Sequence, residues 1–231
     1  MGLRTTIFGS VYAPQVPVIQ WDGLWKLNEV SAGAVLDSSG NGKDGVNVGA
    51  TIGAVGKFGS GYSYDGGDKV VLSAINNDFT GSFSIGCWAK ANTTKSFMRL
   101  IDTMGVNGSG CILYMNHTNS FLRANDGTQM NLGNTSNLGN NLWHLFFMTF
   151  DITTGTGCLY SDTQTYRVTQ ANMIGKVLQP SRDVTAGNYA GAFNNTYSYV
   201  GIQDEIMFKK EAITEEEYLS IYNNGIGREQ N

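Results

Sequence analysis

The sequence predicts an all-β protein in which two antiparallel sheets pack face to face, with one short helix near the carboxyl end. Only 15% of the 231 residues are charged and 30 are glycine, whereas a helical bundle would be rich in Glu, Lys, Ala and Leu. Apolar residues come in short runs, and several runs alternate with polar residues as in a half-buried strand. Turn residues separate the runs about every ten positions, which is typical of a β-sandwich. The length suits one such domain.

Residues 1–22 are predicted to form an extended N-terminal arm, and residues 23–231 the sandwich domain. The arm shows no regular period, and Pro14 and Pro17 favour an extended backbone. The domain pattern begins with the apolar stretch GLWKLNEV at 23–30, which is the first predicted strand.

The first half of the domain is predicted to continue with short strands and tight turns. After a turn-rich loop at 34–45, the segment 56–73 predicts two short strands around an Asp-Gly-Gly-Asp turn. In FTGSFSIGCWAK, at 79–90, Phe, Ile, Cys and Ala alternate with Ser, Gly, Trp and Lys. This period of two places Trp88 on the more polar face of a strand.

The second half contains the most apolar run, LWHLFFMTFD at 142–151, which predicts a strand buried on both faces. The segment TTGTG after it predicts a hairpin turn. Trp88 and Trp143 are expected to be largely buried, because they lie within the clearest strand patterns. Shorter strands are predicted at 96–102, 111–115, 120–124 and 128–132, and in the segments CLYSD and TYRVT.

One helix is predicted, near the end of the chain. Thr214 is a good N-cap, and Glu217 three positions later completes a capping box. Three consecutive glutamates in the first turn favour the positive end of the helix dipole. Tyr218 and Ile221 lie on an apolar stripe, and Gly225 is expected to end the helix.

Three blocks of the sequence, in order, resemble the laminin-G-like family of concanavalin A-like lectin jelly rolls. They are LWKLNEVSAGAVLDSSGNGKDGVNVGA, then GKFGSGYSYDGGDKVVLS followed by FTGSFSIGCWAKA, and finally YVGIQDEIMFKKEAITEEEYLSIYNNG. The resemblance covers residues 23–225 and implies a two-sheet antiparallel jelly roll of about a dozen strands, in agreement with the strand pattern. One departure is Ser161-Asp162-Thr163, which stands where the family often has an Asp-Gly turn.

The resemblance also implies a structural calcium ion. In many family members the loop after the opening strand meets the Asp of the closing Asp-Glu pair around calcium, and these positions correspond to Asp37, Asn41, Asp44 and Asp204. Hard oxygen ligands of this kind suit Ca²⁺. The alternative is a glycine-rich turn in which the Asp side chains accept hydrogen bonds from their own backbone.

Catalysis is not expected from this sequence. Glycosidases of this fold carry paired carboxylates at short spacing on one strand, and the family pattern Glu-x-Asp-x-x-Glu is missing here. Asp204 and Glu205 are adjacent, so on a regular strand they point to opposite faces. His144 lies in an apolar run and is expected in the core, and the three cysteines are expected to be buried and unpaired.

A carbohydrate-binding surface is predicted in the segment NYAGAFNNTYSYVG. Sugars stack on exposed aromatic rings, and asparagine side chains hydrogen-bond hydroxyl groups. The aromatic candidates in this segment are Tyr189, Phe193, Tyr197 and Tyr199. The alternative is that these rings pack within the sandwich.

Charge and hydropathy argue against two kinds of partner. The net charge is −4 and no basic stripe is present, which argues against nucleic-acid binding. No apolar run approaches the length of a membrane-spanning helix, and the first residues lack the pattern of a secretory signal.

The composition of the N-terminal arm predicts a role in assembly. The arm is apolar, with few charges, and its apolar residues include Phe8, Val11, Tyr12, Val16 and Val18. Exposed to water, such a segment would promote aggregation, so we expect it to attach to another subunit of an oligomeric assembly. The alternative is that it packs on its own sandwich as an extra edge strand.

These patterns predict a non-enzymatic structural or binding module. An arm joined to a jelly roll, without a secretion signal, favours a phage virion component, such as a tail, fibre or capsid-surface protein, that also binds glycans. The first alternative is a bacterial surface or exported lectin-like protein, located outside the cell or at its surface. The second is a glycosidase-like enzyme. A sugar bound at the aromatic segment would favour the first alternative, and a convergent carboxylate pair in a cleft the second.

Overall fold

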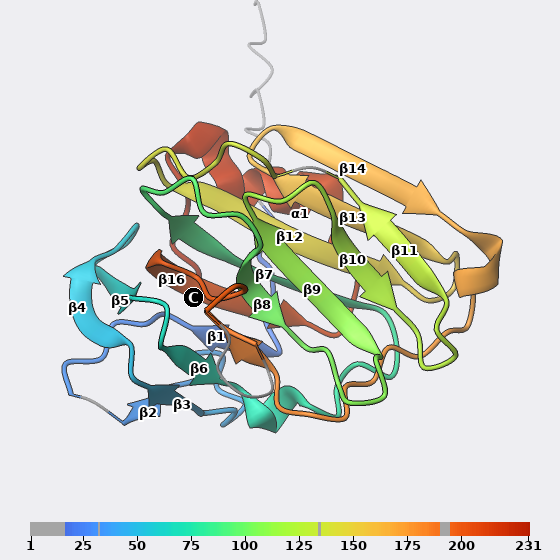
Figure 1. Ribbon diagram of the computed structural model, residues 1–231, viewed down its shortest axis with the longest axis horizontal. Helices are drawn as coiled ribbons and strands as arrows, with labels where there is room; N and C mark the ends of the chain where they lie inside the picture. The colour runs from blue at the N-terminus through green and yellow to red at the C-terminus, as the bar shows by residue number, and fades with distance from the viewer. Residues whose placement is uncertain (1–16, 32, 134, 190–194) are drawn as a thin grey trace, which may run out of the picture.

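The computed structural model describes residues 17–31, 33–133, 135–189 and 195–231, which form two sheets packed face to face and one α-helix (Figure 1). Each sheet has eight strands, and every strand pair is antiparallel. The all-β sandwich with a short carboxyl-terminal helix is therefore confirmed. There are more strands than the resemblance implied, because several of them are only two or three residues long.

The two sheets have different strand orders. Sheet A consists of β14 (Gln164–Thr169), β13 (Thr156–Ser161), β12 (His144–Asp151), β7 (Phe83–Lys90), β16 (Gly201–Lys209), β5 (Ser60–Tyr64) and β4 (Thr51–Val55), with β1 (Gly23–Trp25) also beside β16. Sheet B consists of β11 (Gln129–Leu132), β10 (Ser120–Arg123), β9 (Gly110–Met115), β8 (Met98–Asp102), β15 (Thr185–Ala186), β6 (Lys69–Val71), β3 (Gly45–Val48) and β2 (Ala34–Val35).

Long connections build the centre of sheet A. β7 lies between β12 and β16, and neither of these is its neighbour in sequence. The predicted turn between β5 and β6 likewise joins two sheets instead of closing a hairpin. Strands that are distant in sequence therefore pair at the centre of the fold, as in a jelly roll.

The main core fills the space between the sheets. The alternation expected for 79–90 is confirmed, because Phe83, Ile85 and Cys87 of β7 all belong to this core. Sheet B contributes the facing layer, which includes Leu100, Leu113, Leu122, Met130 and Leu132.

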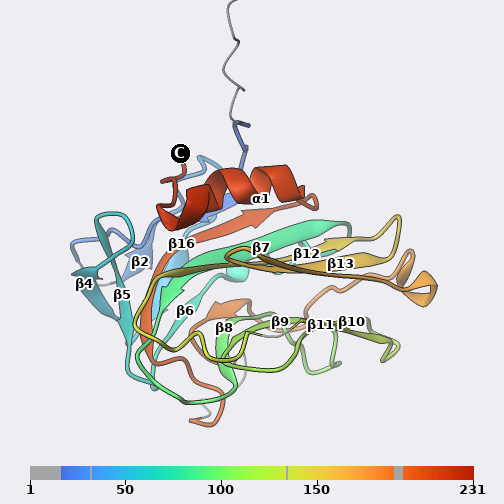
Figure 2. The same ribbon diagram turned by 90° about the horizontal axis from the view of Figure 1, so that it is seen from above.

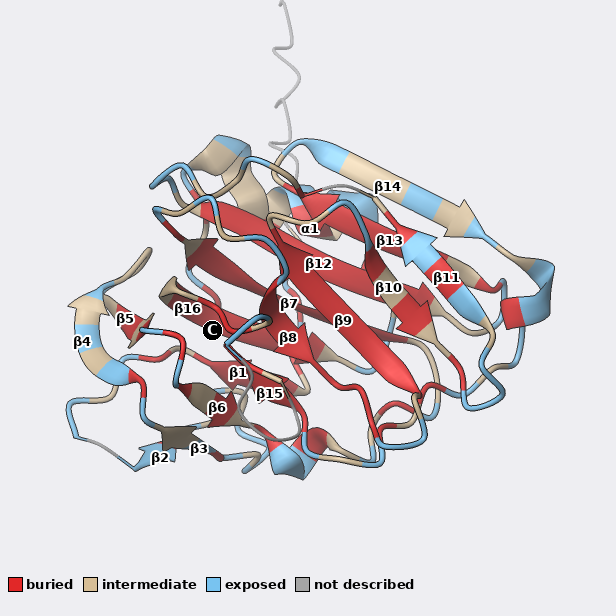
Figure 3. Cartoon of the chain, in the orientation of Figure 1, coloured by how far each residue is buried: buried red, intermediate tan, exposed pale blue. Residues whose placement is uncertain are grey.

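The outer face of sheet A is buried as well, because α1 (Glu215–Tyr222) and the segment before β1 lie across it (Figures 2 and 3). In this second cluster Trp21 stacks on Phe147 of β12, and Trp88 of β7 is fully buried. β7 and β12 are thus buried on both faces, as predicted for 142–151. Trp88 and Trp143 were both expected to be largely buried. This expectation was wrong for Trp143, which precedes β12 and is only half-buried.

The helix starts as predicted. The Thr214 hydroxyl accepts a hydrogen bond from the Glu217 N–H (3.1 Å), and the Glu217 carboxylate accepts one from the Thr214 N–H (2.7 Å). The helix ends at Tyr222, three residues before Gly225, because Asn223 adopts a left-handed conformation with φ 45° and supplies the cap. Among the described residues, no helix is both long and apolar enough to cross a membrane.

Two local departures from the predicted strands have backbone causes. The first strand ends at Trp25, because Leu27 adopts a left-handed conformation with φ 56° that a strand cannot contain. The Ser161-Asp162-Thr163 segment forms a tight turn, in which Ser161 pairs with Gln164 and Asp162 has φ 52°. Asp162 thus takes the positive φ that glycine often supplies in hairpin turns.

Candidate functional site

The outer face of sheet B differs from that of sheet A, because no helix in the described part of the chain crosses it (Figure 2). Along β9, Cys111, Leu113 and Met115 belong to the main core. Successive side chains of a strand point to opposite faces, so Ile112 and Tyr114 lie on the outer side, where they form a small separate cluster. This is the face on which side chains of the sheet can meet a ligand.

Aromatic rings gather on this face around Arg99 of β8. The guanidinium carbon of Arg99 lies 4.5 Å from the ring centroid of Tyr197, 4.7 Å from that of Tyr189 and 5.8 Å from that of Tyr114. Arg99 also forms a salt bridge with Asp102, which is fully buried. Cation–π contacts contribute about 2 kcal/mol when they are shielded from water. Arg99 therefore holds together tyrosines that are far apart in the sequence.

Phe97 is the most exposed ring of this group. Its side chain is 40% exposed, and its ring centroid lies 4.2 Å from that of His117 and 6.1 Å from that of Tyr197. Its φ of 60° lies in the left-handed region, which bulky residues rarely adopt. Backbone strain of this kind is often found at binding sites. We define the aromatic cluster as Phe97, Tyr114, His117, Tyr189 and Tyr197.

A polar pocket of about 300 Å³ includes residues next to the aromatic cluster in the chain. We call it the Asn116 pocket, and it is lined by Thr93, Thr94, Ser96, Asn116, Ser136, Asn137 and Gly139. The Asn116 amide donates to the Thr93 carbonyl (2.9 Å) and accepts from the Gly139 N–H (3.0 Å), so it ties the two walls together. Ser96 and Asn116 of the pocket directly precede Phe97 and His117 of the cluster, so pocket and cluster are neighbours along the chain.

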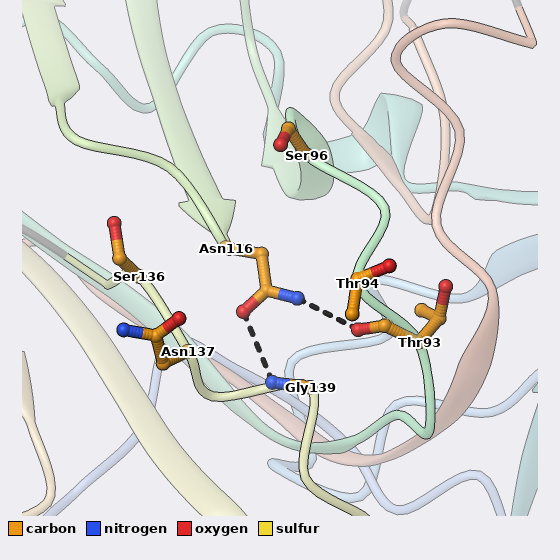
Figure 4. A pocket seen from close by; sticks show the side chains of 7 residues that line it. All are labelled: Thr93, Thr94, Ser96, Asn116, Ser136, Asn137 and Gly139. Carbon is orange, nitrogen blue, oxygen red and sulfur yellow. Dashed lines mark hydrogen bonds between the residues drawn. The ribbon is translucent and has the colours of Figure 1, made fainter.

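The chemistry of the Asn116 pocket suits binding. Thr94, Ser96 and Asn137 present hydroxyl and amide groups (Figure 4). These groups donate and accept hydrogen bonds, but they do not ionise near neutral pH and so cannot serve as a general acid or base. None of the described residues that line the pocket is an acid, a base or an activated nucleophile.

The aromatic residues predicted to bind a ligand have three different outcomes. Tyr189 and Tyr197 come together in the aromatic cluster. Tyr199 is fully buried in the main core, and its hydroxyl donates to the Lys90 carbonyl (2.8 Å) and accepts from the Lys90 N–H (3.0 Å). Its packing is the alternative that the sequence left open. Phe193 lies outside the described residues.

The sequence analysis missed Arg99 and three members of the cluster, Phe97, Tyr114 and His117. One signal was available, because the alternation in CILYM places Tyr114 opposite the core residues Leu113 and Met115. The meeting of β8 and β9 with the segment after β15 has no signature in the sequence, because it depends on strand pairing.

The residues predicted to bind calcium are held by hydrogen bonds. Both Asp37 carboxylate oxygens accept two: Oδ1 from the N–H groups of Leu24 (3.0 Å) and Ser39 (2.9 Å), and Oδ2 from the Lys43 N–H (2.9 Å) and the Ser39 hydroxyl (2.9 Å). Partial burial alone would raise the pKa of Asp37, but these donors outweigh it and hold the pKa below its ordinary value. No lone pair of this carboxylate remains for an ion.

The other three predicted ligands are also engaged. Asp44 accepts a hydrogen bond from the Asp37 N–H (2.8 Å), and the Asn41 amide donates to the Trp21 carbonyl (3.2 Å). Asp204 accepts from the Phe58 N–H (2.7 Å). Within the described ranges, no group of three or more His, Cys, Asp or Glu residues is placed to hold a metal. The loop as folded does not fit calcium, and calcium binding stays an untested prediction.

Asp204 and Glu205 do not follow the alternation expected of them. A β-bulge interrupts β16 at this point, and Glu205 has φ 45°. Both side chains are buried, and the Glu205 carboxylate accepts from the Gln230 N–H (2.8 Å). Burial raises the pKa of Asp204 to about 7 and that of Glu205 to about 8. Because both carboxyl groups are shielded from solvent, they do not form a pair in an open cleft.

His144 is confirmed as a buried residue with satisfied ring nitrogens. Nδ1 lies 2.5 Å from the Asp162 carboxylate and Nε2 lies 2.8 Å from the Asn140 side-chain oxygen. The three cysteines are buried and unpaired, as expected.

The predicted arm is described only at its carboxyl end. Phe8, Val11, Tyr12 and Val16 lie outside the described residues. Val18 is 83% exposed, whereas Ile19 and Trp21 are each only 5% exposed and belong to the cluster beneath α1. The end of the arm is therefore part of the packed domain.

The fold defines a jelly-roll-like β-sandwich domain. Solved structures of this architecture include the botulinum neurotoxin serotype D/C binding domain, which is 16% identical with a TM-score of 0.63 over 90% of this chain and 52% of that chain. Domain 4 of an extracellular arabinanase from Geobacillus stearothermophilus, in complex with arabinotriose, is 15% identical with a TM-score of 0.59 over 90% and 98%. Trypanosoma rangeli sialidase is 13% identical with a TM-score of 0.59 over 92% and 34%.

At these identities the likeness shows the fold alone. The chain spans about half the length of the neurotoxin binding domains that it matches. No family model and no curated protein sequence matches this chain. The resemblance to the laminin-G-like family therefore stays a prediction from the sequence.

Proposed function

We propose that this protein is a non-enzymatic module that binds a glycan at the aromatic cluster and the Asn116 pocket. The observation that carries the proposal is the joining of Phe97, an exposed aromatic ring, to a pocket lined by hydroxyl and amide groups. The apolar face of a sugar packs on an aromatic ring, while its hydroxyl groups exchange hydrogen bonds with Ser, Thr and Asn side chains. The cluster and the pocket supply both.

Proteins of the same architecture support the proposal. The arabinanase domain was solved with arabinotriose bound. A structure of botulinum neurotoxin type C, whose cell entry depends on interaction with two ganglioside molecules, is also similar in fold. A neurotoxin D/C binding domain was also solved in complex with the protein synaptotagmin II. Jelly-roll-like sandwiches thus serve binding in several settings.

Catalysis is not part of the proposal. Asp102, the carboxylate that pairs with Arg99 of the cluster, is buried and neutralises that guanidinium. The adjacent pair Asp204 and Glu205 lies in sheet A and is closed to solvent. A glycosidase would need two carboxyl groups that flank a bound sugar.

Binding to an array of neutral and acidic oligosaccharides tests the proposal. We expect the unmodified chain to bind at least one glycan, and Phe97→Ala and Tyr197→Ala each to weaken that binding roughly tenfold, the effect of losing one stacking contact. The control is Leu219→Ala on α1, which removes a similarly exposed apolar side chain (48%) from the opposite side of the sandwich. An array without any binding, or equal losses in all three variants, would contradict the proposal.

We also propose that the module is attached to a larger assembly through residues 1–22. A phage virion component is the first candidate and a bacterial surface lectin the alternative. The observation in favour is the placement of Ile19 and Trp21, which fix the end of the arm on the helix-covered side while Val18 is exposed. An attachment there leaves the outer face of sheet B open to a glycan.

A further inference from the structure

Arg182 joins the aromatic cluster through Tyr189. Its Nη1 donates to the Tyr189 hydroxyl (2.9 Å), and its guanidinium carbon lies 5.6 Å from the centroid of the same ring. The side chain is half-buried, and within the described ranges it forms no salt bridge. A guanidinium carries five N–H donors and a full charge, and arginines that leave water are normally paired. Arg182 is thus a positioned cation that has no counter-ion among the described residues.

Arg182 is one of the residues that line a second polar pocket, of about 630 Å³. We call it the Arg182 pocket, and it is lined by Ser73, Asn76, Asn77, Pro180, Ser181, Arg182 and Asp183. Within the described ranges, the Asp183 carboxylate of this pocket forms no salt bridge with Arg182, and it accepts a hydrogen bond from the Asn76 amide (2.8 Å). Asn76 in turn accepts from the Val184 N–H (2.9 Å), which fixes this side of the pocket. The hydroxyl and amide groups of the lining suit a sugar, as in the Asn116 pocket.

Three cations lie at or next to the aromatic cluster: Lys95, Arg99 and Arg182. Of these three, Arg99 has a carboxylate partner, Asp102. Lys95 donates to the Ser198 hydroxyl (2.6 Å), next to Tyr197, and among the described residues neither Lys95 nor Arg182 has an ion-pair partner. The chain as a whole carries a net charge of −4, so its general field repels anions. Any preference for an anion must therefore arise locally at this face.

We propose that the Arg182 pocket is a second subsite of the glycan site and that it binds the carboxylate of an acidic sugar residue. The inference rests on the proposed glycan-binding function and narrows its ligand to acidic oligosaccharides. A guanidinium binds a carboxylate through two parallel N–H···O bonds, and Tyr189 beside it offers a ring to the same sugar. The next residues of the glycan lie over Tyr197 and Phe97 and reach the Asn116 pocket.

A set of matched glycans separates this inference from the general function. Oligogalacturonates, sialyllactoses and glucuronate-containing oligosaccharides are each presented as the free acid and as the carboxyl methyl ester, together with sulfated neutral oligosaccharides. We expect the acid to bind about tenfold more tightly than its ester, the effect of one charge-assisted bidentate contact. Arg182→Gln should abolish the difference and leave ester binding unchanged. Arg182→Lys should keep part of it, since an ammonium supplies charge without the bidentate geometry.

The control is Arg167→Gln, which removes one positive charge from β14 of sheet A and should change neither affinity. Equal binding of acid and ester, or an unchanged ratio in Arg182→Gln, overturns the inference while the glycan function stands. A preference for the sulfated sugars over the carboxylates overturns the assignment of a carboxylate. If no member of the set binds, acid, ester or sulfated, both the inference and the proposed function fail. Melting curves of each variant verify that it is folded.

Discussion

Arg99 shows how one residue can organise a surface. It is nearly buried, its charge is neutralised by Asp102, and it lies between Tyr189 and Tyr197. Its N–H also donates to the Tyr197 carbonyl (3.0 Å), so backbone and side chain both hold the segment that carries these tyrosines. A change at Arg99 would remove the cation that balances the buried Asp102 carboxylate, which destabilises strongly. Arg99 therefore positions the cluster and is a poor choice for testing ligand contact.

The buried carboxyl groups of Asp204 and Glu205 predict an unusual pH dependence of stability. Burial raises the pKa of Asp204 to about 7 and that of Glu205 to about 8, so the folded state binds these protons more tightly than the unfolded state does. Their contribution is complete below the ordinary carboxyl pKa and is lost as the pH rises through 7 and 8. We expect a higher melting temperature at pH 5 than at pH 8, and Glu205→Gln should flatten this dependence.

The matched control for this measurement is Glu216→Gln, which removes an exposed carboxylate in the first turn of α1. It should leave the slope of melting temperature against pH unchanged. A wild-type protein that is equally stable at pH 5 and 8, or a Glu205→Gln variant with the wild-type slope, would show that these carboxyl groups do not titrate in this range.

At the scale of elements, the sequence predicted what local patterns can encode. The alternation in 79–90 and the apolar run at 142–151 predicted β7 and β12, and the capping box predicted the start of α1. β15 and β2 escaped prediction, because two residues are too few to show a period. The bulge in β16 also escaped, and with it the joint burial of Asp204 and Glu205.

The candidate site was predictable only in part, for a related reason. The aromatic segment drew attention to Tyr189 and Tyr197 because it is dense in Tyr, Asn and Gly. Their partners Phe97 and Tyr114 lie on β8 and β9 or next to them, and only sheet pairing brings these strands to the same place. Alternation in one strand shows which residues share a face, but it cannot show which strands are neighbours.

The loop after β2 yields a prediction at the element scale. Asp37 accepts four hydrogen bonds, of which one, from the Leu24 N–H, holds the loop against β1 and three close the loop on itself. We expect Asp37→Ala to lower the free energy of unfolding by about 2–3 kcal/mol, the loss of several bonds to a charged acceptor. Asp44→Ala, which removes the acceptor of the Asp37 N–H, should destabilise less. Both are measured by denaturant unfolding with EDTA and again with calcium.

Unfolding measured with EDTA and with calcium distinguishes an Asp37 held by hydrogen bonds from an Asp37 that binds a calcium ion. If N–H donors are the partners of Asp37, the effect of Asp37→Ala is the same with EDTA and with calcium. A destabilisation that appears only with calcium would mean that the loop rearranges around the ion, as the family resemblance implied. A wild-type melting temperature that falls with EDTA would support the same conclusion.

At the scale of the whole molecule, the outer faces of the two sheets are covered differently. α1, the segment around Trp21 and the carboxyl end cover sheet A (Figure 2). The indole N–H of Trp21 donates to the Gln230 side chain (3.2 Å), so the anchored end of the arm and the end of the chain lie side by side. The aromatic cluster and the Asn116 pocket belong to the opposite sheet. Attachment on one side and recognition on the other do not compete for surface.

Two truncations test whether the arm is the attachment. Ile19 and Trp21 pack beneath α1, so removal of residues 1–22 should destabilise the domain by about 3 kcal/mol or more, as expected for losing a buried aromatic side chain and its neighbour. Removal of residues 1–16 spares both side chains and should leave the melting temperature and glycan binding unchanged. If the arm tethers the protein to other subunits, the full chain should form oligomers in light scattering and the 1–16 truncation should be monomeric. A truncation that assembles like the full chain would refute the tether, and one that melts as early as the 1–22 truncation would show that residues 1–16 belong to the fold.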